Sequence, residues 1–95
     1  QNKEEIAILQ RYWEKEISKE YQVTAFAKAL ATQDSLSSYY EHDFYKRYAL
    51  LFDGIKEESA EKLLLSLYFF SQQKDQFRST LPKIYLIKLG FNFNI

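Results

Sequence analysis

His42 is the only histidine in this sequence, and it is the side chain best suited to acid–base chemistry near neutral pH. Its neighbours Glu41 and Asp43 carry carboxylates, but residues adjacent in sequence point in different directions along a helix. No order of serine, histidine and carboxylate that would suit nucleophilic catalysis can be built around it. We therefore expect His42 to be a surface histidine and the chain to be an interaction domain rather than an enzyme.

Metal and phosphate chemistry also lack their usual residues. The chain has no cysteine and its carboxylates are scattered, so no set of three or four ligands emerges. The adjacent Glu57 and Glu58 suit the first turn of a helix, where the helix dipole favours negative charge. Two isolated glycines cannot form a glycine-rich phosphate loop. We expect no metal and no cofactor.

Length and composition set the broad class of protein. A chain of 95 residues is one domain, or a domain with a small appendage. Its 13 basic and 13 acidic residues cancel, which argues against nucleic-acid binding through bulk charge. The apolar run from Leu63 to Phe70 is too short to span a bilayer, and no signal-peptide pattern is present. The absence of cysteine fits a reducing compartment, so we expect a cytoplasmic protein with no membrane partner.

Apolar residues recur at helical spacing throughout, so the elements that must position these side chains are helices. Asn2 with Glu5 predicts an N-cap for a first helix, and Thr24 predicts the cap of a second, shorter one. A third helix is expected from about Ser35, with Gly54 ending it in the left-handed conformation. The first helix should bury a stripe of Ile6, Leu9, Trp13 and Ile17. The central core should contain Trp13, Leu36, Phe44, Tyr48 and Leu51.

Two further helices are expected after Gly54. The stretch "KEESAEK" begins a helix whose "LLLSLYFF" segment is apolar nearly all round, and a polar break follows near residues 71–76. The last helix should begin at Thr80, with Pro82 in its first turn, and end at Gly90. The fold prediction is all-α, a small helical bundle over residues 1–54 followed by a C-terminal helical hairpin over residues 55–95. Because the sequence begins with glutamine, we expect it to be a piece of a longer protein.

The hairpin carries more large apolar side chains than two helices can cover by themselves. Over residues 63–95 there are four basic side chains and one acidic one, so the hairpin is also cationic and would favour an acidic partner surface. Such a hairpin either folds back on the first helices or binds a partner. The expected partner-binding residues are Tyr68, Phe69, Phe70, Lys74, Phe77, Arg78, Lys83, Tyr85, Ile87 and Lys88.

A helix-turn-helix is an alternative interpretation of residues 24–47. An alanine-rich helix, a polar turn and a following helix bearing serines and tyrosines have the order of a DNA-binding regulator. The turn lacks glycine, however, and Asp34, Glu41 and Asp43 on the second helix would oppose phosphate. We expect no direct sequence-specific nucleic-acid binding by this segment. A free-standing helical binding protein, such as an immunity or antirepressor protein, is a third interpretation.

Two stretches, "EEIAILQRYWEKE" and "YYEHDFYKRYALLFDGI", resemble parts of the C-terminal helicase-binding domain of bacterial replicative primases (the DnaG type). That domain is related in fold to the N-terminal domain of the replicative helicase. The resemblance implies a non-catalytic domain of the primosome in DNA replication. Its C-terminal hairpin would dock on the hexameric helicase and modulate it during primer synthesis, while the catalytic modules of the primase would lie upstream.

Overall fold

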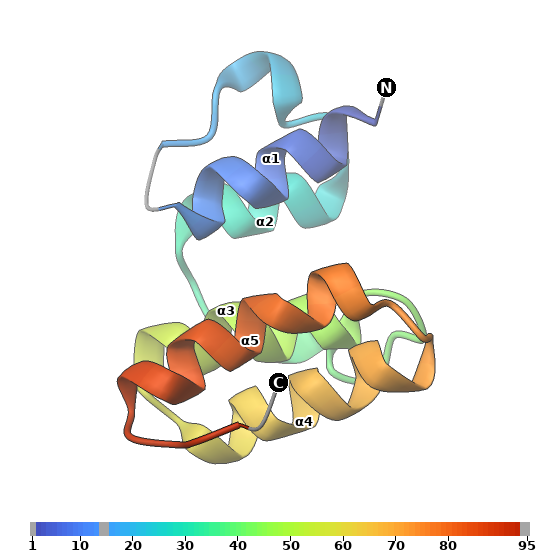
Figure 1. Ribbon diagram of the computed structural model, residues 1–95. Helices are drawn as coiled ribbons and strands as arrows, with labels where there is room; N and C mark the ends of the chain where they lie inside the picture. The colour runs from blue at the N-terminus through green and yellow to red at the C-terminus, as the bar shows by residue number, and fades with distance from the viewer. Residues whose placement is uncertain (1, 14–15, 94–95) are drawn as a thin grey trace. The chain divides into compact units, whose positions relative to one another are not determined.

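The computed structural model describes residues 2–13 and 16–93. Within these residues the chain forms five α-helices and two short 3-10 turns, and no strand (Figure 1). The all-α prediction is therefore confirmed. The helices belong to two compact units, one spanning residues 1–35 and the other spanning residues 36–95.

The first unit contains α1 (Lys3–Tyr12), the 3-10 turn η1 (Lys19–Tyr21) and α2 (Ala25–Thr32). Both predicted N-caps are present. The Asn2 side chain accepts a hydrogen bond from the backbone N–H of Glu5 at 3.2 Å, and the Thr24 hydroxyl accepts one from Ala27 at 3.1 Å. The same hydroxyl donates to the carboxylate of Glu4 at 2.5 Å, which ties the first turn of α1 to the start of α2.

The buried face of α1 is not the stripe that was expected. The helix buries Ala7, Ile8 and Tyr12, whereas Leu9 is exposed and Trp13 is 61% exposed. The expected stripe followed the largest side chains, but the fully buried Ala7 and the fully buried Ala27 of α2 show that small residues take part in this core. Ile17 is buried as predicted, although α1 ends at Tyr12. Glu14 and Lys15, between them, lie outside the described residues.

The second unit contains the 3-10 turn η2 (Ser37–Tyr39), α3 (Lys46–Glu57), α4 (Ala60–Gln72) and α5 (Gln76–Lys88). Helix α4 packs on both α3 and α5, and α4 and α5 run antiparallel as a hairpin (Figure 1). Eight consecutive residues of α3, from Arg47 to Gly54, are buried, so this helix lies at the centre of the unit.

The prediction of a helix from Ser35 is wrong, because α3 begins only at Lys46. The ring nitrogen Nδ1 of His42 accepts hydrogen bonds from the backbone N–H groups of Phe44 and Tyr45, both at 3.1 Å. This side-chain acceptor competes with helical hydrogen bonding and satisfies two donors just ahead of α3. Phe44 consequently lies outside the helix and is 47% exposed rather than in the core. Leu36, Tyr48 and Leu51 are buried as predicted.

Gly54 does not end the third helix. Helix α3 continues to Glu57, and Glu58 takes the left-handed conformation with φ 54°. The Ser59 N–H donates to the Gly54 carbonyl at 2.9 Å and the Glu58 N–H to the Ile55 carbonyl at 3.3 Å, which is the Schellman pattern. Gly54 is needed for another reason. A Cβ at this position would lie 2.9 Å from Cγ of Leu63, so α4 approaches α3 more closely than a side chain would allow.

The boundary between the compact units also differs from the expected division after residue 54. That position lies inside α3, which packs on α4, whereas the units divide after Ser35. The last helix begins at Gln76 rather than at Thr80, because the Asp75 carboxylate accepts from the backbone N–H of Arg78 at 3.0 Å and caps it. Pro82 therefore lies inside α5. Gly90, at φ 102°, follows the end of the helix as predicted.

Gly54→Ala should destabilise the protein by about 1–3 kcal/mol through overpacking, even though alanine favours the helix by about 1 kcal/mol. Urea denaturation measures this change. Leu63→Ala removes the side-chain atoms that the new methyl group would meet, so the double variant should lose less stability than the two single losses added together. A Gly54→Ala protein as stable as the unsubstituted chain would contradict the close α3–α4 contact.

Candidate interaction surface

The second unit contains a polar cluster around Asp53, which is 2% exposed. The backbone N–H of Leu36 donates to both carboxylate oxygens of Asp53, at 3.1 and 3.0 Å, and the Tyr40 hydroxyl donates to Oδ2 at 2.5 Å. These bonds join the segment around η2 to the middle of α3. Because the carboxylate is enclosed and accepts hydrogen bonds from within the fold, it holds these two segments together. The sequence analysis did not identify this role of Asp53.

Burial raises the pKa of Tyr40, and its hydrogen bond to Asp53 raises it further. The pKa of Lys62 is also raised, first by its 2.7 Å hydrogen bond to Glu57 and then by its interaction with Tyr40. The ammonium group lies 5.4 Å from the centre of the Tyr40 ring. The side chains of Asp53, Tyr40 and Lys62 thus stabilise one another at the edge of the core.

The acid–base and metal chemistry considered from the sequence has no matching group of side chains in the described part of the chain. His42, the candidate acid–base residue, uses Nδ1 to accept two backbone hydrogen bonds. Among residues 2–13 and 16–93 there is no group of three or more histidines and carboxylates that could hold a metal ion.

Helix α4 has one buried side and one exposed apolar side. Leu63, Ser66 and Phe70 are buried, and the hydroxyl of Ser66 donates to the Arg47 carbonyl of α3 at 2.7 Å. The opposite side carries Leu64, Leu65 and Tyr68, all exposed, with Tyr68 at 55%. An exposed row of large apolar side chains is typical of a protein interaction site.

Helix α5 repeats this division. Its buried side carries Ser79, Pro82 and Leu86, while its exposed side carries Phe77, Ile84 and Ile87. Phe77 is 71% exposed, more than any other large apolar side chain among the described residues. We call the six large apolar side chains that are exposed on these two helices the hairpin surface: Leu64, Leu65, Tyr68, Phe77, Ile84 and Ile87.

Basic side chains also lie on the hairpin. Arg78 is paired with Asp75 at 3.0 Å, whereas the Lys88 ammonium lies over the ring of Tyr85 at 4.4 Å. Lys83 lies 5.9 Å from the ring centre of Phe93 in the segment after α5. Because Asp75 is the one acidic residue of positions 63–95, these cations give the hairpin a positive charge.

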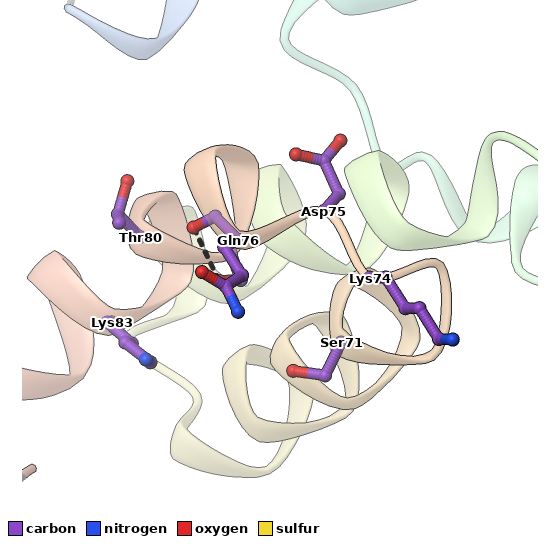
Figure 2. Close-up of a pocket in the computed structure, with 7 residues that line it drawn as sticks. Ser71, Lys74, Asp75, Gln76, Thr80 and Lys83 are labelled. Atoms are coloured by element: carbon purple, nitrogen blue, oxygen red, sulfur yellow. Dashed lines mark hydrogen bonds between the residues drawn. The ribbon is translucent and has the colours of Figure 1, made fainter. Parts of the chain in front are cut away.

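A hollow of about 570 Å³ lies between the end of α4 and the start of α5 (Figure 2). Lys74 and Lys83 stand on opposite sides of it in the view of Figure 2. Among the lining residues, the Ser79 hydroxyl donates to the Gln76 carbonyl at 2.8 Å. Two lysines and one acidic residue, Asp75, line the hollow. The complete lining is Ser71, Lys74, Asp75, Gln76, Ser79, Thr80 and Lys83.

The structure separates the ten expected partner-binding residues into three groups. Phe70 is fully buried and meets Tyr48 edge-on at 5.2 Å, so it belongs to the core and cannot contact a partner. Phe69 is partly covered, with the Lys46 ammonium 4.3 Å from its ring centre. Arg78, Lys83 and Tyr85 are also partly exposed. The exposed members are Tyr68, Lys74, Phe77, Ile87 and Lys88.

Sequence reasoning missed Leu64, Leu65 and Ile84. A signal for the first two was present in "LLLSLYFF", because Ser66 is the small polar residue that a close helix contact tolerates. Helical spacing places Leu63 and Phe70 on the side of Ser66, and Leu64, Leu65 and Tyr68 on the other. Ile84 could have been found from its spacing of three residues from Ile87.

Comparison with known proteins gives no match to this chain, whether with family models, with curated proteins or with solved structures. Over residues 2–13 and 16–93, none of the helices combines the length and the apolar character needed to cross a membrane.

Tyr40→Phe should reduce the loss of stability at alkaline pH. Because the pKa of Tyr40 is raised above 10.0, its neutral hydroxyl favours the folded state; this contribution is complete below pH 10.0 and is lost as the pH rises through the higher folded value. Urea denaturation at about pH 8 and about pH 11 measures the loss. Tyr68→Phe, which changes an exposed ring, is the control. Equal losses in the two variants would contradict the contribution of Tyr40.

Proposed function

We propose that this chain is a non-catalytic protein-interaction domain whose α4–α5 hairpin binds a partner protein. The observation that carries the proposal is the hairpin surface, in which six large apolar side chains are exposed on two adjacent helices. Aromatic and aliphatic anchors of this kind dominate the energy of protein interfaces. The lysines of the hairpin favour an acidic partner, chiefly by raising the rate of encounter.

The expected partner is the N-terminal domain of a bacterial replicative helicase, in the cytoplasm. What supports this part of the proposal is the resemblance of residues 4–16 and 39–55 to the helicase-binding domain of replicative primases, together with the expected C-terminal hairpin. In this role the domain would bring a primase to the helicase, with the catalytic modules elsewhere in the parent protein.

The helix-turn-helix alternative is not proposed, because its second helix is not formed. Residues 37–39 make a single 3-10 turn, and the next helix begins at Lys46. Of the two basic residues at the end of this segment, Arg47 is buried and Lys46 lies against the ring of Phe69. Neither is presented as a recognition helix would present a base-reading side chain.

Tyr68→Ala and Phe77→Ala should each weaken binding to the helicase N-terminal domain, by about 2 kcal/mol or more at the better site. Isothermal titration calorimetry measures the affinity, and circular dichroism checks that helicity is retained. Trp13→Ala is the matched control, since the exposure of this aromatic residue lies between those of Tyr68 and Phe77 but it belongs to the first unit. Helicase binding that both hairpin variants retain would exclude the hairpin surface, and no binding by the unsubstituted chain would exclude the helicase.

A further inference from the structure

Helix α5 carries two rows of mainly apolar residues at helical spacing, and only one of them is buried within the fold. The row of Ser79, Pro82 and Leu86 is buried. A second row has the spacing three, four, three and consists of Phe77, Thr80, Ile84 and Ile87, all exposed. We call these four residues the outer seam. This spacing is that of the a and d positions through which one helix packs along another.

The sides of the outer seam are cationic. With Phe77 and Ile84 at a positions, Lys83 takes a g position and Lys88 an e position, next to the residues that a second helix would contact. The other two flanking residues are neutral: Gln76 is exposed, whereas Leu81 is buried within the fold. No acidic side chain flanks the seam, since the nearby Asp75 caps α5 and is paired with Arg78.

The charges of these flanking residues distinguish two possible binding partners, a second copy of this chain and a helix of another protein. In a parallel pair of α5 helices, Lys83 of one copy would face Lys88 of the other, because g positions meet e positions five residues further on. In an antiparallel pair, lysines would meet lysines or neutral residues, because the only charged flanks are basic. A second copy therefore gains no ion pair in either direction. A helix with glutamate or aspartate beside its own apolar row pairs with both lysines.

We propose that the outer seam binds an amphipathic helix of the partner protein whose apolar row is flanked by acidic residues. The inference rests on the proposed function and specifies the partner's binding element. The apolar residues of the seam supply contact area, and Lys83 and Lys88 select the charge of the partner helix and reject basic helices.

Two synthetic helical peptides test this selection. Both are about four heptads long with leucine at a and d; one has glutamate at e and g, the other lysine. In fluorescence anisotropy titrations with the full chain, the acidic peptide should bind about tenfold or more tightly than the basic one. Lys83→Glu with Lys88→Glu should reverse this order, and Ile84→Ser with Ile87→Ser should abolish binding of both. Trp13→Ala, at an exposed position of the first unit, should leave the preference unchanged.

Equal affinity for the two peptides, or no binding of either, would overturn the proposal. Self-association in sedimentation experiments that Ile84→Ser with Ile87→Ser abolishes would assign the seam to a second copy. Binding to anionic phosphatidylserine vesicles that the same double substitution abolishes would assign the seam to lipid. Self-association or vesicle binding of this kind would also overturn the proposal. Helicase binding that survives Lys83→Glu with Lys88→Glu would reject this inference and leave the proposed function standing. Peptide preference without helicase binding would reject only the proposed partner.

Discussion

The contact between Gly54 of α3 and Leu63 of α4 sets the distance between the two central helices, and the surface of the hairpin follows from it. A Cβ at position 54 would lie 2.9 Å from Leu63, so this separation is open to glycine alone. The close approach fixes which side of α4 faces inward, and Ser66 and Phe70 lie on that side with Leu63. Leu64, Leu65 and Tyr68 must then face outward, because helical geometry places them on the opposite side.

Polar groups hold α3 at the centre of this arrangement. The Asp53 carboxylate accepts hydrogen bonds from the N–H of Leu36 and the hydroxyl of Tyr40. The Ser66 hydroxyl donates a hydrogen bond to the carbonyl of Arg47. Arg47 itself is buried, with its guanidinium 5.0 Å from the Phe44 ring centre and its Nε lacking a hydrogen-bond partner. An unsatisfied buried donor costs about 1–3 kcal/mol, which the satisfied bonds around it must offset.

Local signals in the sequence predicted the fold class and the caps at Asn2 and Thr24, because capping depends on residues within one turn. They did not predict that His42 would accept hydrogen bonds from backbone N–H groups ahead of α3, which begins only at Lys46. This outcome depends on competition between side-chain and helical hydrogen bonds. Gly54 has the same sequence signature as a helix end and as a close helix contact, and only packing on α4 distinguishes the two. Similarly, the excess of aromatic residues predicted an exposed surface, but packing on Tyr48 decided that Phe70 would be buried.

The claim that the hairpin surface serves binding rather than folding has a direct test in the free energy of unfolding of a single variant. Tyr68, Ile84 and Ile87 are replaced together by glutamine, and urea denaturation is compared with that of the unsubstituted chain. Exposed positions of this kind usually change stability by no more than about 0.5 kcal/mol each, so the variant should unfold at nearly the same urea concentration. A loss of about 4 kcal/mol or more would contradict the account, because it would show that these side chains are packed in the core.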